Sequence, residues 1–179
     1  MKLRTIAVSL ALAAGLGIAG AAQAQGKIYI GGTAGFVDAD ATGFDNAHVI
    51  GVYGGYNMLG KDSHFAADLK GGNLAIEGEV LFTLLDGDAG AFGDWSISTL
   101  GVFAAYRHPL TDKFYIKGKA GLVRYDIDVT GGAGDSDTAL AIGAAGGWKV
   151  GPGNLEVGLT SYEGDTDSLL VTAGFHMTF

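Results

Sequence analysis

Residues 168–179 of the chain read Ser-Leu-Leu-Val-Thr-Ala-Gly-Phe-His-Met-Thr-Phe, and two kinds of side chain alternate along them. One set is apolar and ends on an aromatic residue (Leu169, Val171, Ala173, Phe175, Met177 and Phe179). The other set is mostly small or polar and includes His176. Because successive side chains of a β-strand point to opposite faces, this pattern predicts a strand with one apolar face. A histidine on the second face suits a polar interior better than the apolar core of a soluble protein.

Similar alternation recurs in seven earlier segments, each of about nine to fourteen residues, which is long enough for a tilted strand to cross a bilayer. These segments are Lys27–Val37, His48–Asn57, Asn73–Leu84, Trp95–Arg107, Lys113–Asp126, Thr138–Val150 and Asn154–Tyr162. With the last segment, Ser168–Phe179, they make the smallest even number of strands found in bacterial outer-membrane barrels. The sequence therefore predicts an all-β fold, an eight-stranded antiparallel up-and-down transmembrane β-barrel.

The two faces of these segments indicate which side meets lipid. One face carries large apolar residues such as Ile50, Val52 and Leu100, whereas the opposite face is small or charged, as at Gly31 and Glu77. A soluble eight-stranded barrel has the reverse arrangement, with its large apolar side chains inside. This inversion predicts that the apolar face contacts the membrane.

The first 24 residues have the pattern of a secretory signal peptide. Lys2 and Arg4 precede an apolar run over residues 6–18, and Ala22-Gln-Ala24 supplies the small residues that a signal peptidase requires. The alternative, a transmembrane helix, fits less well because alanine and glycine dominate the second half of the segment. We expect residues 1–24 to be removed and residues 25–179 to form a single barrel domain.

The charge of the chain limits its partners. The net charge is −8 at pH 7, and removing two bases and no acid with residues 1–24 makes it −10. Such an acidic chain is not expected to bind nucleic acid. The sequence contains no cysteine, so disulfides and thiolate metal sites are excluded.

The acidic residues gather in the connections that the topology places on the outside of the cell. If the last strand ends at the periplasm, the external loops are Asp38–Ala47, Gly87–Asp94, Ile127–Asp137 and Glu163–Asp167. Residues 58–72 then form a periplasmic turn, which is predicted as either a short helix, a mobile loop or an extension of a strand.

Five Asp-x-Asp pairs occur in or beside these loops (Asp38/Asp40, Asp86/Asp88, Asp126/Asp128, Asp135/Asp137 and Asp165/Asp167). In an extended chain this spacing directs both carboxylates to one side, where their oxygens can hold Ca²⁺ or Mg²⁺. One hypothesis is that such ions bridge the acidic rim to lipopolysaccharide phosphates. The other is a solvated acidic surface that keeps the loops soluble.

Seven charged residues on the inward face are predicted to lie in the periplasmic half of the barrel (Glu77, Glu79, Arg107, Lys117, Lys119, Lys149 and Glu156). An eight-stranded lumen is only wide enough for side chains to fill it. The sequence therefore predicts a salt-bridged plug, with a gate or an ion path as the alternative interpretation.

The sequence shows no catalytic or cofactor-binding motif. Its 32 glycines include stretches such as Gly51-Val-Tyr-Gly-Gly55, but no strand, glycine loop and helix follow one another as a nucleotide site requires. The four histidines are scattered and do not pair with a serine in a recognisable motif. We expect neither enzymatic activity nor a cofactor.

The chain resembles the outer-membrane β-barrel domain family that includes OmpX, the transmembrane domain of OmpA and opacity-type surface antigens. The resemblance rests on residues 29–35, 51–56, 74–79, 101–107, 117–121 and 174–179. It implies a monomer in the outer membrane of a Gram-negative bacterium, surrounded by membrane lipids and lipopolysaccharide. It also implies that the barrel-assembly machinery recognises Phe175, Met177 and Phe179.

The expected role is non-enzymatic, in outer-membrane integrity and cell-surface properties. The alternatives are a narrow porin-like channel for small ions or solutes, and a surface adhesin that acts through the acidic loops. The loops are short for an adhesin, and the first periplasmic turn is longer than the usual tight turn of the family.

Overall fold

The computed structural model of the chain describes residues 28–39, 43–58, 71–132, 134–163 and 167–179. Three sequence predictions fall outside the described residues. These are the signal peptide over residues 1–24, the conformation of residues 59–70, and the positions of Asp40 and Asp165.

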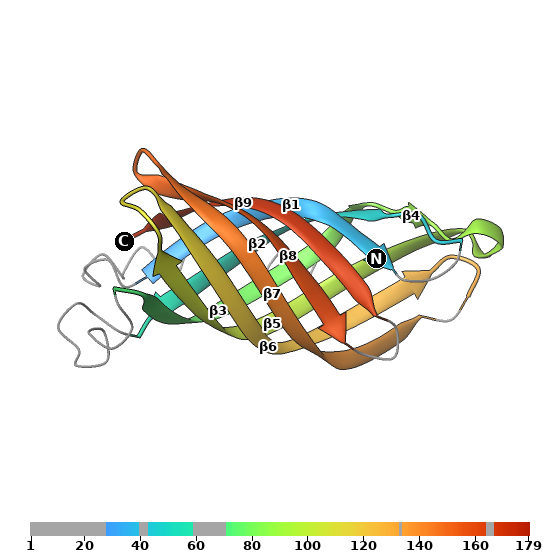
Figure 1. Ribbon diagram of the computed structural model, residues 1–179. Coiled ribbons are helices and arrows are strands. Elements are labelled where there is room, and N and C mark those ends of the chain that lie inside the picture. Colours follow the sequence, from blue (N-terminus) through green and yellow to red (C-terminus); the bar gives the residue numbers. More distant parts are fainter. Residues whose placement is uncertain (1–27, 40–42, 59–70, 133, 164–166) are drawn as a thin grey trace.

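The strands form one closed antiparallel barrel (Figure 1). In chain order they are β1 (Ile28–Ala39), β2 (Ala47–Asn57), β3 (Asn73–Leu85), β4 (Gly87–Asp88), β5 (Asp94–Pro109), β6 (Phe114–Val129), β7 (Asp135–Val150), β8 (Gly153–Glu163) and β9 (Ser168–Thr178). Each strand pairs with its neighbour, and the pairing of β1 with β9 closes the sheet. Both β3 and the two-residue β4 pair with β5 and together occupy one position in the barrel. The predicted eight-stranded architecture is therefore confirmed.

The barrel has two distinct ends. The start of β1, the end of β9 and the turn between β7 and β8 lie at one end, which we call the terminal end. The opposite loop end carries β4 and a short 3-10 helix over Gly90–Phe92. In Figure 1 the terminal end is on the left and β4 marks the loop end on the right. No helix in the described part of the chain is long and apolar enough to cross a membrane.

The outer surface of the barrel is apolar, as the alternation predicts. Leu122 and Trp148 are 61% and 57% exposed, and Ile76, Leu100 and Val102 are exposed to a similar degree. In water this exposure would cost about 25 cal/mol of folding free energy for each Å² of apolar surface left unburied. Lipid tails remove that penalty, so the outer surface matches a membrane environment.

Two strands, β6 and β7, extend three residues further toward the loop end than the sequence predicts. β5, β6 and β7 each contain 16 residues, and the β6–β7 ladder continues to the pair Ile127↔Asp135. The prediction of an external loop over Ile127–Asp137 is therefore wrong, since most of that segment is strand. Backbone pairing continues where the side chains become polar, whereas hydrophobic alternation marks only the part that faces lipid. The predicted loop Gly87–Asp94 likewise contains β4 and the 3-10 helix.

The sequence predicts an inward face of small or charged residues. This prediction was incomplete, because the interior also contains large apolar side chains. The loop-end half holds an apolar cluster that we call the inner core (Val37, Ala47, Val49, Leu81, Ala89, Trp95, Ile97, Phe103, Val123, Tyr125, Ala139, Ala141, Tyr162 and Leu170). Trp95 donates from Nε1 to the carbonyl oxygen of Asp45 at 2.8 Å, and its ring lies 5.9 Å from that of Phe44. These contacts fasten the segment before β2 to the inner core. An eight-stranded lumen is narrow enough for such side chains to fill it.

Candidate functional site

The terminal-end half of the interior holds four charged side chains from four different strands. Glu77 on β3 and Glu156 on β8 face Arg107 on β5 and Lys117 on β6. Arg107 Nη2 lies 3.1 Å from Glu77 Oε2, and Arg107 Nε lies 3.2 Å from Glu156 Oε1. Lys117 Nζ lies 3.3 Å from Glu77 Oε2 and 2.5 Å from Glu156 Oε2. We call these four residues the ionic cluster, in which each base bridges both acids.

The ionic cluster is buried and has hydrogen bonds beyond its ion pairs. Glu77 is fully buried and Lys117 and Glu156 are each 6% exposed. Tyr29 donates its hydroxyl to Glu77 Oε2 at 2.8 Å, and Tyr115 donates to Glu156 Oε1 at 2.6 Å. Buried charges are tolerated only when they are paired and hydrogen-bonded in this way.

Tyr29 and Tyr115 were not identified as site residues from the sequence, although strand alternation places both on the inward face. Each tyrosine ring also needs a glycine opposite it. A Cβ on Gly147 would lie 2.0 Å from Cζ of Tyr115, and one on Gly55 would lie 2.2 Å from Cζ of Tyr29. These two glycines therefore make room for the tyrosine rings whose hydroxyl groups donate to the ionic cluster.

His176, on the inward face of β9, lies beside the ionic cluster, with its Nδ1 3.9 Å from Glu156 Oε1. Its Nδ1 lies 3.0 Å from the hydroxyl of Tyr53, and its Nε2 lies 3.1 Å from the side-chain nitrogen of Asn154. Because an amide nitrogen only donates, Nε2 accepts this hydrogen bond and the ring proton lies on Nδ1. His176 thus contributes hydrogen bonds to the interior but no net charge.

A separate ion pair lies nearer the inner core. Lys119 Nζ is 3.0 Å from Glu79 Oε2 and 4.3 Å from the ring centre of Phe103. Lys149, by contrast, is exposed at the end of β7 and forms no ion pair among the described residues. Its assignment to the interior charges was wrong, because strand parity gives the face of a residue but not its height along the barrel axis. Without Lys149 the buried charges comprise three acids and three bases, so they balance.

A small polar cavity adjoins the ionic cluster, because Lys117 and Glu156 are among its lining residues. Its volume is about 30 Å³, and its lining includes Thr33, Thr160, Thr172, Glu79 and Lys119. A buried water needs about 10–15 Å³ and two to four polar partners, so this cavity suits one or two waters.

The predicted acidic rim is spread around the loop end. Asp38 lies on β1, Asp88 on β4, Asp126 and Asp128 on β6, and Asp135 and Asp137 on β7, while Asp86 and Asp167 lie outside the strands. Within the described residues no three acidic or histidine side chains come together as a possible metal site. Asp135 and Asp137 instead accept hydrogen bonds at 2.8 and 2.7 Å from the backbone amides that follow them.

The aromatic end of β9 lies at the closing seam of the barrel. Phe175, Met177 and Phe179 are exposed on the outer surface. The amide of Phe179 donates to the carbonyl of Ile28 at 2.7 Å, which continues the pairing of β9 with β1 beyond the strand end. The terminal residues are therefore part of the barrel wall.

A family model described as outer membrane protein beta-barrel domain matches residues 7–175 of the chain. A comparison with the sequences of curated proteins finds no match.

Solved structures of bacterial proteins share the fold. Neisserial surface protein A has a TM-score of 0.60 and 17% identity, and the match covers 85% of this chain and 97% of that protein. The N-terminal β-barrel domain of Pseudomonas aeruginosa OprF has a TM-score of 0.55 and 13% identity, with coverage of 84% and 97%. Ail, the attachment invasion locus protein of Yersinia pestis, has a TM-score of 0.52 and 16% identity, again with coverage of 84% and 97%.

Proposed function

Because the chain belongs to the family of outer membrane protein beta-barrel domains, we propose that it is a non-enzymatic integral outer-membrane protein. In this proposal the barrel contributes to membrane integrity and cell-surface properties and does not conduct. The family implies the outer membrane of a Gram-negative bacterium.

The observation that supports a non-conducting barrel is its filled interior. A hydrated ion would have to pass the ionic cluster, where Glu77 and Glu156 each contact two bases. It would then meet the inner core, where Phe103 and Trp95 are almost fully buried. Removing one partner of a buried ion pair costs about 3–5 kcal/mol, so spontaneous opening of the cluster is expected to be rare.

The proposed orientation places the terminal end at the periplasm and the loop end outside the cell. It puts the exposed aspartates of β6 and β7 at the cell surface, among lipopolysaccharide and its divalent cations. It also leaves Phe175, Met177 and Phe179 accessible to the barrel-assembly machinery before closure. We propose a monomer, because the closed sheet leaves no barrel strand that needs a second chain.

The distribution of histidines supports a role without catalysis. His48 is exposed near the loop end, His176 is buried in the terminal-end half, and His108 contacts Tyr106 on the outer surface. Among the described residues these histidines occupy separate places, so they do not form an acid–base pair of the kind that acyl transfer or hydrolysis requires.

Single-channel recording of the refolded protein in a planar bilayer tests this proposal. The parent and Glu77→Ala, Lys117→Ala and Lys149→Ala variants are compared, with insertion verified by the different gel mobility of folded and boiled protein. We expect the parent and the exposed-site control Lys149→Ala to show no steady conductance. Steady parent conductance that Glu77→Ala or Lys117→Ala alters would refute the proposal and identify a narrow channel.

A further inference from the structure

Part of the sheet continues past the closed barrel at the loop end. β7 pairs with β8 only as far as Leu140↔Glu163, whereas it pairs with β6 as far as Ile127↔Asp135. Figure 1 shows β6 and β7 reaching beyond the adjoining ends of β8 and β9. Within the described part of the chain, residues 135–139 therefore have a neighbouring strand on one side only.

Backbone geometry determines which amides face the open side of this segment. In an antiparallel ladder the N–H and the C=O of a residue point toward the same neighbour, and the direction alternates along the strand. The amide of Lys149 donates to the carbonyl of Lys113 on the β6 side, and the register of the β6–β7 ladder has no break. Odd-numbered residues of β7 therefore face β6, so the amides of Ser136 and Thr138 face the open side.

Two carboxylates bind these amides. The amide of Ser136 donates to Oδ1 of Asp135 at 2.8 Å, and the amide of Thr138 donates to Oδ1 of Asp137 at 2.7 Å. Amides that face the open side recur at every second residue, so two aspartates with one residue between them bind two successive amides. This geometry explains the spacing of the Asp135/Asp137 pair without a metal ion.

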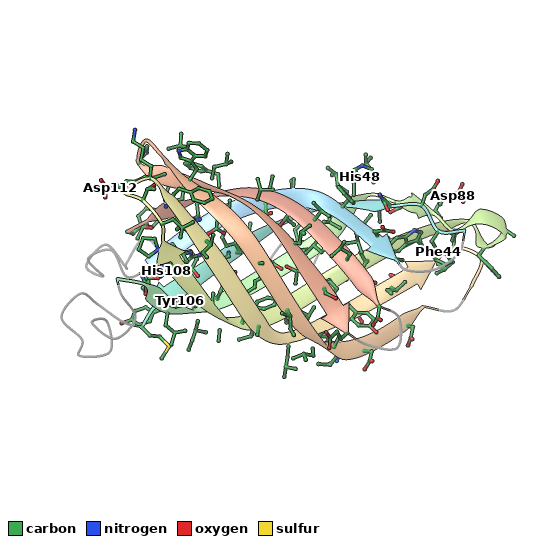
Figure 2. All side chains as sticks on the ribbon, viewed as in Figure 1. Phe44, His48, Asp88, Tyr106, His108 and Asp112 are labelled. Carbon is green, nitrogen blue, oxygen red and sulfur yellow. The ribbon has the colours of Figure 1, made fainter. Side chains whose placement is uncertain are left out.

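The opposite edge of the projecting sheet is closed in a different way. β4 forms that edge, and the carbonyl of Asp88 accepts a hydrogen bond from the amide of Asp45 at 2.7 Å. The indole of Trp95 donates to the carbonyl of Asp45, which holds this segment against the sheet. Figure 2 shows Phe44 and Asp88 together at the loop end, whereas Asp112 lies at the terminal end. A backbone segment thus covers one edge, and side chains cap the amides of the other.

We propose that Asp135 and Asp137 are capping residues that close the projecting edge of β7 to strands of other chains. An exposed edge with unpaired N–H and C=O groups is a template on which a further strand can pair. An incoming strand needs the amides of Ser136 and Thr138, and it obtains them only by displacing both carboxylates. The loop end therefore does not bind extended peptides through its backbone. This role does not depend on whether the barrel conducts.

Capping differs from two other roles that these carboxylates could have. Exposed amides bond to water when they have no other partner, so the caps contribute little to folding stability. Repulsion by negative charge would be shared by Asp126 and Asp128, which lie on the adjoining strand β6. An asparagine at position 135 or 137 keeps the acceptor oxygen and removes the charge. Substitutions at these sites therefore distinguish capping from stabilisation and from repulsion.

NMR titration of the refolded protein in lipid nanodiscs with a synthetic strand peptide tests the proposal. The peptide has the sequence of residues 123–130, a segment of the chain that pairs with this part of β7 at its other edge. The amide signals of Ser136 and Thr138 report binding. Each hydrogen bond changes an equilibrium constant by about fivefold, so Asp135→Ala/Asp137→Ala should bind the peptide about 30-fold more tightly than the parent. Asp135→Asn/Asp137→Asn and Asp126→Ala/Asp128→Ala should bind it as the parent does.

Equal binding by the parent and Asp135→Ala/Asp137→Ala would overturn the proposal. The same gain for the asparagine variant or for Asp126→Ala/Asp128→Ala would overturn it too, because charge repulsion would then exclude the peptide. Binding of the alanine variant should be lost when the backbone amides of the peptide are methylated, and retained binding would show that no strand is added. The urea midpoint of the alanine variant should equal that of the parent, and a lower midpoint would assign the carboxylates to folding stability instead.

Discussion

Replacing Glu77 with alanine should destabilise the barrel strongly, because Glu77 is the fully buried acid of the ionic cluster. The substitution removes ion pairs with Arg107 and Lys117 and the hydrogen bond from Tyr29. It also leaves three buried bases with two acids. We expect a loss of about 3–5 kcal/mol, the usual cost of leaving a buried charge unpaired.

Urea unfolding of the refolded protein in lipid vesicles measures this loss through tryptophan fluorescence and gel mobility. With an m-value of about 2 kcal/mol per molar, the unfolding midpoint should fall by about 1.5–2.5 M. The double variant Glu77→Ala/Lys117→Ala restores the balance of buried charges, so it should be more stable than the sum of the two single changes predicts. Lys149→Ala is the control and should leave the midpoint unchanged within about 0.5 kcal/mol.

A loss below about 1 kcal/mol for Glu77→Ala would refute this reasoning, because exposed ion pairs contribute no more than that. Additive effects of the two single changes would refute it as well. Either result would mean that water reaches the cluster and that the terminal-end half of the lumen is open.

Three further outcomes are expected from other parts of the barrel. Gly147→Val should lower the unfolding midpoint by more than Gly118→Val does, because only at Gly147 would the new side chain overlap the ring of Tyr115. Equal effects would contradict the close contact between Gly147 and Tyr115. In single-tryptophan variants, brominated lipid should quench Trp148, which faces outward, much more than Trp95, which is 2% exposed; equal quenching would place Trp95 near lipid. Phe179→Ser should slow assembly in vesicles containing the assembly machinery, and an unchanged rate would remove the terminal residue from that signal.

Hydrophobic alternation was sufficient to predict the number of strands and which face meets lipid. It could not predict how far β6 and β7 extend, because hydrogen bonding continues to Ile127↔Asp135 without an apolar face. Backbone pairing is nearly independent of the side chains at such positions.

The interior was predicted less completely, because alternation gives the direction of a side chain and not its depth. Glu77 and Lys117 meet although β3 and β6 are not neighbours, and this contact depends on how the strands are staggered around the barrel. Lys149 occupies an alternate position of β7 in line with the buried residues, but it lies near the end of the strand, where its side chain is exposed. The inner core was not predicted, because only the charged residues of the inward face were considered as interior groups and apolar ones such as Phe103 were not.

The pairing of β1 with β9 imposes an order of events during biogenesis. The Thr33 hydroxyl donates to the carbonyl oxygen of Ala173, 140 residues further along the chain. β1 and β9 therefore gain their second neighbouring strand only when they pair with each other. Until then the sheet has two unpaired edges, which are prone to pair with other chains. Contacts so distant in sequence also make folding slow. The time before closure is therefore the period in which the sheet is most open to pairing with other chains.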